Sequence, residues 1–219
     1  MRWNSFWRVK MIQRIRTALK RMKNLQRNQS DSEAKNIRHL NTDELEAGLE
    51  EALTSPTDEG IVNLIVCRPD VGQRKVLQSA EFSLEIGLVG DNWSKKPYSK
   101  SPDGGPHPEM QVTMINRRVL DLITAGDTNR RAVPGDQLVV DFDLSLVNLP
   151  PGTKLNIGST IIEVTEEPHT GCSQFVGWFG ADAMRFVNSS RGRQLCLRGI
   201  NAKVVQSGKI SQGDQITKG

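Results

Sequence analysis

The sequence predicts a mainly β protein, built as a closed or partly closed β-barrel with a few short helices. After Gly60, short apolar runs alternate with turns rich in Gly, Pro, Asn and Asp. Strands and helices do not alternate regularly along the chain, which argues against a doubly wound nucleotide-binding fold. The composition, with 37% hydrophobic and 25% charged residues among 219, is typical of a soluble globular protein. No apolar run reaches about 18 residues, so we expect no membrane-spanning helix.

Residues 1–30 are strongly basic, unlike the rest of the chain. They contain nine Lys and Arg residues and no acid, whereas the whole chain has a net charge of +4. Residues 31–219 therefore carry a net charge of −5, which is +4 minus +9. This mildly acidic body, with few aromatic residues, makes nucleic acid an unexpected partner.

The basic segment is amphipathic when it is placed on a helix. One side of the helix is apolar and consists of Trp7, Met11, Ile15, Ala18, Leu19, Met22 and Leu25. The other side is cationic and consists of Arg16, Lys20, Lys23 and Arg27. Three interpretations stay open. Residues 1–27 could lie as a helix on an anionic membrane surface, or form an Arg-rich organelle-targeting peptide. Alternatively, the segment is a disordered tail, or the true start is Met11 or Met22.

Residues 31–60 are predicted to form a linker and a docking helix. The stretch from Asn28 to Asn36 is polar, as linkers are. In the following segment, Asn41 or Thr42 can cap a helix, and Glu44 completes an approximate capping box. A narrow apolar stripe would dock this helix on the body, and consists of Leu45, Leu49, Ala52 and Leu53.

Residues 61–219 are predicted to form the barrel domain. Six strands are expected, at Ile61–Cys67, Met110–Ile115, Gln137–Phe142, Lys154–Ile157, Thr160–Thr165 and Ala202–Gln206. Short helices are expected at Arg117–Thr124 and Ala181–Asn188. The Pro- and Gly-rich segment Lys95–Pro108 is predicted to be a long loop, either functional or disordered. His107 within it is expected to be an exposed loop histidine, with a substrate contact as the alternative.

The three cysteines are too few and too scattered for a disulfide framework or a four-cysteine zinc site. A reducing compartment such as the cytoplasm fits this usage best. Cys67 ends an apolar strand and Cys196 lies between two leucines, so both are expected to be small hydrophobes in the core.

Cys172 has a different setting, because a strand runs out into Pro168-His-Thr-Gly-Cys172 and a helix is expected to follow. Near a helix N-terminus, free amide donors favour thiolate over thiol. His169 could add a proton acceptor or a positive charge. A thiolate serves as a nucleophile, a persulfide carrier or a soft metal ligand. The alternatives are a buried, inert cysteine and a histidine that only caps the turn.

Arg198 opens the last predicted strand region and is followed by a glycine, which lets a backbone or ligand come close. An arginine there could bind a phosphate or carboxylate bidentately, or form a structural ion pair. The pairs Gly90-Asp91, Gly135-Asp136 and Gly213-Asp214 are expected to mark turns rather than catalytic sites.

The order of these motifs resembles the MOSC domain, named after the C-terminal region of molybdenum-cofactor sulfurases. The resemblance spans about Ile61 to Gly219 and is of the stand-alone bacterial type. It rests on an ordered set of motifs: Gly87-Leu-Val-Gly90-Asp91, Gly135-Asp136, Gly158, Pro168-His-Thr-Gly-Cys172, Arg198-Gly-Ile-Asn-Ala-Lys-Val and Gly208 to Gly213-Asp214.

The resemblance implies a barrel related to that of pyruvate kinase, and association with molybdenum cofactor or sulfur transfer. It maps the family's characteristic cysteine onto Cys172, which would ligate molybdenum or carry sulfur, with His169 assisting. Arg198, Thr170 and Gly171 are then candidate cofactor contacts by local chemistry. Cofactor-dependent reduction and sulfur transfer both stay open.

The same resemblance implies partners. In the sulfurases a separate pyridoxal-phosphate domain mobilises sulfur, and this chain has no room for it. A molybdoenzyme, a sulfur donor or electron-transfer proteins would therefore be needed. The alternative is a non-catalytic binding module that residues 1–27 tether to a membrane surface or a partner. We expect a cytoplasmic protein, peripheral on a membrane if the tail binds one, with organelle targeting left open.

Overall fold

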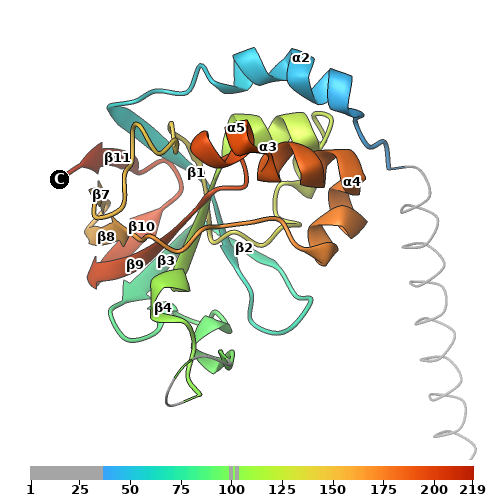
Figure 1. Cartoon of the computed structure of the whole chain (residues 1–219). Coiled ribbons are helices and arrows are strands. Elements are labelled where there is room, and N and C mark those ends of the chain that lie inside the picture. Colours follow the sequence, from blue (N-terminus) through green and yellow to red (C-terminus); the bar gives the residue numbers. More distant parts are fainter. Residues whose placement is uncertain (1–36, 99–100, 102–103) are drawn as a thin grey trace, which may run out of the picture. The chain divides into compact units, whose positions relative to one another are not determined.

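The computed structural model of the chain describes residues 37–98, 101 and 104–219. Residues 39–219 form one compact unit built on a closed barrel of seven strands (Figure 1). Around the barrel the strands follow the order β11 (Gln215–Lys218), β7 (Lys154–Ile157), β8 (Thr160–Val164), β9 (Ile200–Gln206), β5 (Val112–Asn116), β6 (Leu138–Asp141) and β1 (Glu59–Cys67). Pairing of β1 with β11 closes the ring, so the predicted barrel is confirmed.

The barrel is mixed, because β5 and β6 run parallel while every other neighbouring pair in the ring is antiparallel. A parallel pair needs a crossover connection, and here the connection contains a helix. Four further strands lie outside the ring. β2 (Lys75–Leu77) pairs antiparallel with the end of β1. A small second sheet has the order β10 (Gly208–Ser211), β3 (Ser79–Ser83) and β4 (Gly87–Leu88).

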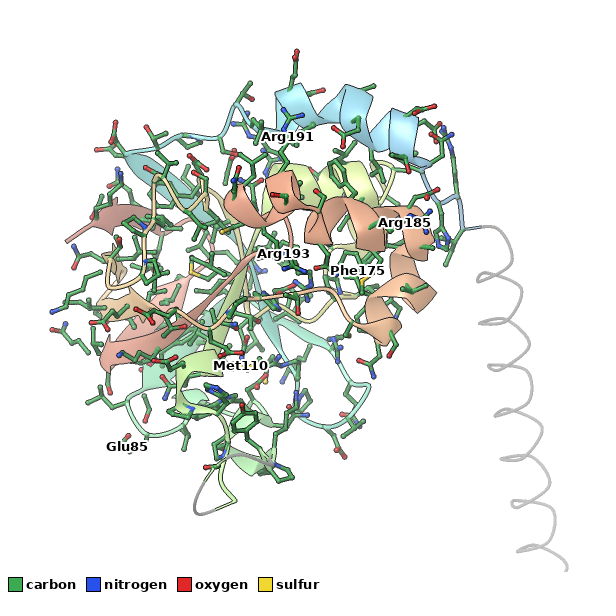
Figure 2. The ribbon with its side chains drawn as sticks, in the orientation of Figure 1. Glu85, Met110, Phe175, Arg185, Arg191 and Arg193 are labelled. Atoms are coloured by element: carbon green, nitrogen blue, oxygen red, sulfur yellow. The ribbon has the colours of Figure 1, made fainter. Side chains whose placement is uncertain are left out.

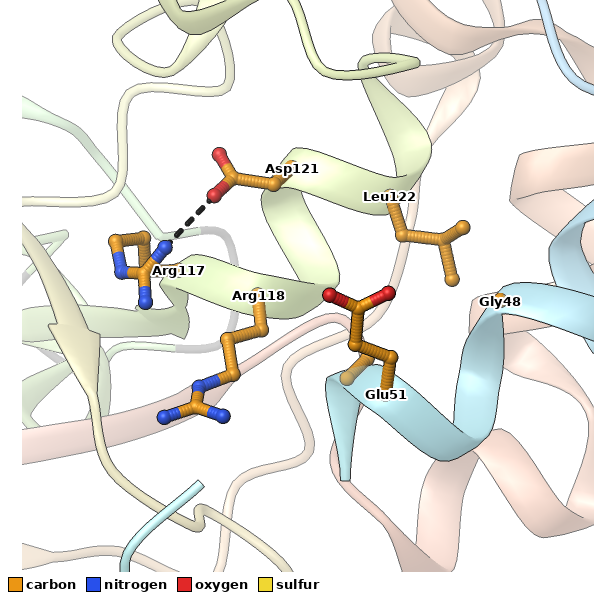
Figure 3. Close-up of a pocket in the computed structure, with 7 residues that line it drawn as sticks. Gly48, Glu51, Arg117, Arg118, Asp121 and Leu122 are labelled. Atoms are coloured by element: carbon orange, nitrogen blue, oxygen red, sulfur yellow. Dashed lines mark hydrogen bonds and ion pairs between the residues drawn. The ribbon is translucent and has the colours of Figure 1, made fainter. Parts of the chain in front are cut away.

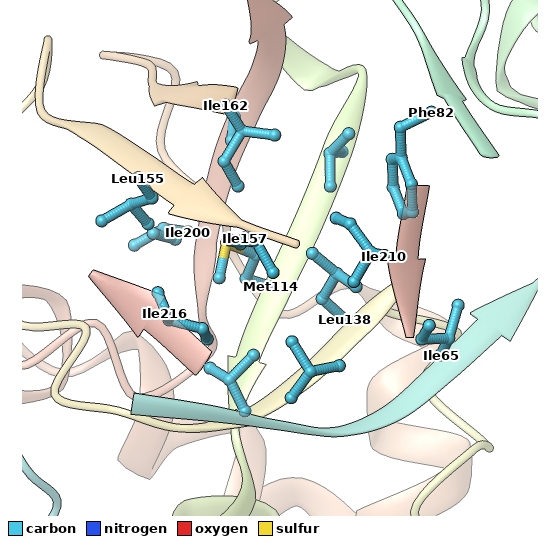
Figure 4. Packing of buried hydrophobic residues seen from close by; sticks show 14 of the residues in the cluster. Ile65, Phe82, Met114, Leu138, Leu155, Ile157, Ile162, Ile200, Ile210 and Ile216 are labelled. Atoms are coloured by element: carbon cyan, nitrogen blue, oxygen red, sulfur yellow. The ribbon is translucent and has the colours of Figure 1, made fainter. Parts of the chain in front are cut away.

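Two hydrophobic cores share the same strands, because successive side chains point to opposite faces. Val112 and Met114 of β5 face the barrel interior, whereas Ile115 faces a second core outside it. In β6, Val140 faces the barrel interior and Val139 faces the second core. The barrel interior holds aliphatic side chains from all seven strands (Figure 4). The small sheet adds to the same interior with Phe82 and Ile210.

Four α-helices contribute to or flank the second core: α2 (Thr42–Ala52), α3 (Arg117–Ile123), α4 (Ser173–Asn188) and α5 (Ser190–Gln194). Three short 3-10 helices lie in loops, η1 (Trp93–Lys95), η2 (Pro108–Met110) and η3 (Thr128–Arg130). The predicted capping box of α2 is confirmed with Asn41 as its N-cap, since Asn41 and Glu44 each accept the other's backbone N–H.

Helix α4 is kinked at Gly180, which has φ +88° and ψ 167°. The predicted helix Ala181–Asn188 is its second half, and the helix expected after Cys172 is its first half. All six predicted strands and the helix at Arg117–Thr124 are also present, with ends shifted by a few residues. The predicted amphipathic helix of residues 1–30 lies outside the described residues. In the described part of the chain, no helix is both long and apolar enough to span a membrane.

The buried amide of Asn116 joins three segments. Its Nδ2 donates to Ser55 Oγ and to the Phe142 carbonyl, both at 2.7 Å, next to the ends of α2 and β6. Its Oδ1 accepts from the backbone N–H groups of Arg118 (2.8 Å) and Val119 (3.2 Å), and so caps α3.

Replacing this residue in Asn116→Ala is expected to lower the free energy of unfolding by about 2–4 kcal/mol. A lost N-cap costs about 1 kcal/mol, and unpaired buried groups about 1–3 kcal/mol. Urea unfolding measures the change. Asn129→Ala, at an exposed position, is the control and should stay within about 0.5 kcal/mol of the parent. Equal losses in the two variants would mean that the network around Asn116 has no special role.

Candidate functional site

Cys172 lies at the start of α4, directly after the turn that follows β8. It is the N-cap residue, and its carbonyl accepts the N–H groups of Phe175 (2.9 Å) and Val176 (3.3 Å). Its thiol is exposed and makes no capping hydrogen bond. The free backbone N–H groups of a first helical turn favour an anionic partner at this position. The predicted order of strand, turn, cysteine and helix is confirmed.

Gly171 is fixed from the far half of α4. Its N–H donates to Asn188 Oδ1 (3.0 Å), and Asn188 Nδ2 donates back to the Gly171 carbonyl (3.3 Å). A Cβ at this position would lie 2.7 Å from Met184 Sδ, so only glycine fits without a shift. The Gly171 amide is therefore engaged within the protein, while Thr170 beside it is exposed.

A buried ion pair joins Asp136 to Arg198. Arg198 Nη1 donates to both carboxylate oxygens, at 3.0 and 2.9 Å, and the two residues are only 2% and 8% exposed. Burial acts against the charge of Asp136, but Arg198 and neighbouring cations hold the pKa of this carboxyl below its ordinary value. The structural ion pair was one of the two roles considered for Arg198, and it is confirmed. The guanidinium also lies 5.3 Å from the ring centre of Phe175 in α4.

His169 is buried beside this pair, with Nδ1 3.6 Å from Asp136 Oδ1. Burial, followed by repulsion from Arg198, lowers the pKa of His169 to about 3. The imidazole is therefore neutral near pH 7 and supplies no positive charge, and the same low pKa makes it a weak proton acceptor. Gly199 adjoins it at φ +105°, and a Cβ there would lie 2.0 Å from the Met114 carbonyl oxygen. The expected close approach after Arg198 is thus made by the backbone of β5.

A group of cations at the end of β1 was not recognised from the sequence. Arg68 forms a bidentate pair with buried Asp91, at 2.9 and 2.7 Å. Among the described residues, the hydrogen bonds of the Arg74 side chain go to the carbonyls of Gln73 and Val133. In the described part of the chain, the ammonium of Lys96 has no hydrogen bond or ion pair. Burial, and next the positive charge of Arg68, lower the pKa of both Arg74 and Lys96.

Two buried polar atoms next to these cations also lack a partner among the described residues, Asn92 Oδ1 and Trp93 Nε1. Both residues belong to the turn that Asp91 holds, because Trp93 N–H donates to Asp91 Oδ1 (3.0 Å). In the sequence, the cationic group appears only as Arg and Lys residues in separate loops. These loops meet only when the barrel closes, so the sequence alone did not indicate the group.

His107 is not the exposed residue that the sequence predicted. Its side chain is 16% exposed, and its ring centre lies 4.4 Å from that of Tyr98. Its Nε2 is 3.6 Å from Glu167 Oε2, and its Nδ1 accepts the Glu109 N–H. His107 therefore lies against the turn that leads to Cys172, which accounts for its low exposure.

The other cysteines differ from Cys172. Cys67 is 5% exposed in the barrel core, as expected, and burial raises the pKa of its thiol. Cys196 is only partly buried, packs against the edge of that core and has φ +49°. Burial raises the pKa of its thiol to about 11, which makes it a poor nucleophile.

Two cavities are relevant. One of about 310 Å³ lies between α2 and α3 (Figure 3), but its arginines are already paired, Arg117 with Asp121 and Arg118 with Asp141. The second, of about 340 Å³, brings together His169, Thr170 and Arg198, whereas neither Gly171 nor Cys172 lines it. Among the described residues, no three His, Cys, Asp or Glu side chains are grouped as metal ligands.

The sequence matches no known family description and no curated protein. Solved structures with a similar fold include the YuaD protein from Bacillus subtilis, at 14% identity over 72% of this chain and 94% of that chain, with a TM-score of 0.49. A hypothetical protein is similar at 16% identity, over 72% and 66% of the two chains, with a TM-score of 0.50. YiiM from Escherichia coli is similar at 14% identity, over 73% and 69%, with a TM-score of 0.49. At these identities, the likeness concerns the fold alone.

The buried histidine predicts a pH dependence of stability. The unfolded chain takes up a proton near pH 6.5, whereas folded His169 does so only near pH 3, so stability is lost as the pH falls through this window. Between pH 7 and 5, the parent should lose up to about 2 kcal/mol more than His169→Gln in urea unfolding. Asn129→Ala, which removes no titratable group, is the control and should keep the parent's loss. Parallel profiles for parent and His169→Gln would refute a buried neutral imidazole.

Proposed function

We propose that Cys172 is the working residue of this protein, either as a thiolate ligand to a molybdenum cofactor or as a sulfur carrier. The observation that carries the proposal is the exposed thiol at the start of α4, while Cys67 is buried and Cys196 is held as a thiol. The ordered motifs that resemble the MOSC domain support the same residue. The corresponding activities would be cofactor-dependent reduction or sulfur transfer.

The residues present fit such a cofactor. A lone thiolate cannot hold a metal ion by itself, so the metal must arrive with ligands of its own, as it does in a metal–pterin. The pterin's phosphate needs cations, and Arg74 and Lys96 are not paired with an acid among the described residues. In the turn held by Asp91, the buried atoms Asn92 Oδ1 and Trp93 Nε1 have no hydrogen-bond partner among the described residues. When bound, the cofactor would supply the redox chemistry.

Other features would assist Cys172. The thiol must lose its proton before it binds a soft metal or attacks sulfur, and the free backbone N–H groups at the start of α4 would stabilise the thiolate. His169, with a pKa of about 3, is too weak a base to be the main acceptor of this proton. Thr170 offers an exposed hydroxyl. Gly171 contributes position rather than a free amide, since its N–H is bound to Asn188. The charge of Arg198 is already balanced by Asp136, so we favour Arg74 and Lys96 as the phosphate partners.

Sulfur transfer would use the same thiolate. It attacks the outer sulfur of a persulfide on a donor protein, a sulfur–sulfur bond forms at Cys172, and the donor departs as a thiolate. Reduction instead requires electrons from partner proteins. Both routes need a partner at the exposed start of α4.

The test is the molybdenum and sulfane-sulfur content of protein from its native source. Cys172→Ser should reduce both to background, whereas the control Cys196→Ser should keep the parent's content. Intact mass spectrometry should also show an adduct of about +32 Da that depends on Cys172 if sulfur is carried. Molybdenum or sulfane sulfur that persists in Cys172→Ser would refute this function, as would absence of both from the parent.

A second proposal concerns the basic segment, because nine cations without an acid in residues 1–30 suit an anionic surface. The full chain should co-sediment with anionic phosphatidylserine vesicles at low salt and detach as salt rises. A variant without residues 1–30 should stay in solution, and neutral phosphatidylcholine vesicles are the control. Equal sedimentation of the two proteins would exclude a tether.

A further inference from the structure

The turn that follows β4 presents Lys96 to solvent beside the end of β1. In this turn, Trp93 N–H donates to Asp91 Oδ1 (3.0 Å) and Asn92 N–H donates to the Arg68 carbonyl (2.8 Å), which joins the turn to the strand end. Lys96 is the C-cap of η1, and its N–H donates to the Trp93 carbonyl at 2.9 Å. The backbone of Lys96 is thereby fixed, while the residue itself is exposed and can be reached from solvent.

Positive charge is in excess around Lys96. The charged groups that act on its ammonium are Arg68, Arg74 and Asp91. The carboxylate of Asp91 is already engaged by Arg68, at 2.9 and 2.7 Å, so it leaves Arg74 and Lys96 without an acid partner in the described part of the chain. Partial burial, and next the charge of Arg68, lower the pKa of Lys96, and Arg74 acts in the same direction. An amine beside other cations is a stronger nucleophile near neutral pH, because more of it is uncharged.

Arg74 has an unused donor in this cationic group. Its Nε and Nη1 donate to the carbonyls of Val133 (3.3 Å) and Gln73 (2.8 Å), whereas Nη2 has no acceptor among the described residues. The guanidinium also lies 5.8 Å from the ring centre of Trp178, and a Cβ at Gly135 would lie 2.4 Å from its Nε. Arg74 is therefore held in place without an acid, which suits the binding of a small phosphate.

We propose that Lys96 is a site of acylation by small acyl phosphates, with Arg74 as the residue that binds the phosphate. The amine of Lys96 attacks the acyl carbon, a carbon–nitrogen bond forms and the carbon–oxygen bond to phosphate breaks. Inorganic phosphate leaves, and the amine proton passes to water. The product is an uncharged amide, so the cationic group loses one positive charge. The reaction uses cations that the proposed function assigns to a pterin phosphate, but it needs neither a cofactor nor Cys172.

Acetyl phosphate is the probe, incubated with the full chain at mildly alkaline pH. Peptide mass spectrometry follows each acetylated lysine as an adduct of about +42 Da. The peptide that contains Lys96 should be acetylated about tenfold faster or more than the one that contains Lys154, which is also exposed. Lys96→Arg should lose this fast adduct. Lys95→Arg is the matched control, because it changes the adjacent exposed lysine in the same way, and it should keep the adduct.

A second reagent and a second pair of variants test the phosphate contact. Arg74→Gln should slow acetylation of Lys96 by acetyl phosphate about tenfold. The same variant should slow acetylation by N-hydroxysuccinimide acetate less, because this ester is uncharged and has no phosphate. Arg191→Gln is the matched control, since Arg191 pairs with Glu46 of α2 at 3.5 Å (Figure 2), and it should react like the parent. Added inorganic phosphate should protect Lys96 from acetyl phosphate.

Three results would overturn the proposal. Acetylation of Lys96 no faster than that of Lys154 would mean that the cationic group does not activate the amine. An equal loss of the fast adduct in Lys95→Arg and Lys96→Arg would place the reaction elsewhere. Equal slowing of both reagents by Arg74→Gln would remove the phosphate contact. Cys172→Ser should be acetylated like the parent, so the metal and sulfur content of that variant bears only on the function proposed above.

Discussion

The ion pair between Asp136 and Arg198 is the interaction on which the site depends. It joins Asp136, two residues before β6, to Arg198, two residues before β9, and these strands lie on either side of β5 in the barrel. A buried pair adds little net stability, but loss of one partner leaves an uncompensated charge that costs about 3–5 kcal/mol. The two strand ends are thereby held together. The guanidinium of Arg198 also lies over the ring of Phe175, so the ion pair helps to position α4. The positive charge of Arg198 helps to keep His169 neutral.

Helix α4 rests on further arginines in its first half. Arg130 lies 5.1 Å from the ring centre of Phe179, and Arg74 lies 5.8 Å from that of Trp178. These contacts come from loops before β6 and after β1, so the position of Cys172 reflects several separate segments. The cationic group therefore serves both to seat the helix and to present positive charge near the end of β1. Fold and candidate site share the same residues.

Local patterns in the sequence predicted the barrel strands that are long and regularly apolar, and the helix that ends at Asn188. They missed β2, β3, β4, β10 and β11, which have two to five residues and bury at most two residues each. Cys172 could be singled out because its turn, cysteine and helix are contiguous. Arg68, Arg74 and Lys96 could not be singled out, since only the folded chain brings the end of β1 near Lys96. The low exposure of His107 could not be predicted either, because it depends on a contact with Glu167, far away in the sequence.

The kink at Gly180 has a mechanical consequence for Cys172. Asn188, at the end of the second half of α4, is hydrogen-bonded to Gly171, while the first half begins at Ser173 and meets the second half at the kink. The hydrogen bonds between Gly171 and Asn188 thus link the two ends of segment 171–188, and Cys172 is the residue next to this link. The backbone of Cys172 is thus held on both sides, by the Gly171–Asn188 hydrogen bonds before it and by α4 after it, although its thiol lies on the surface.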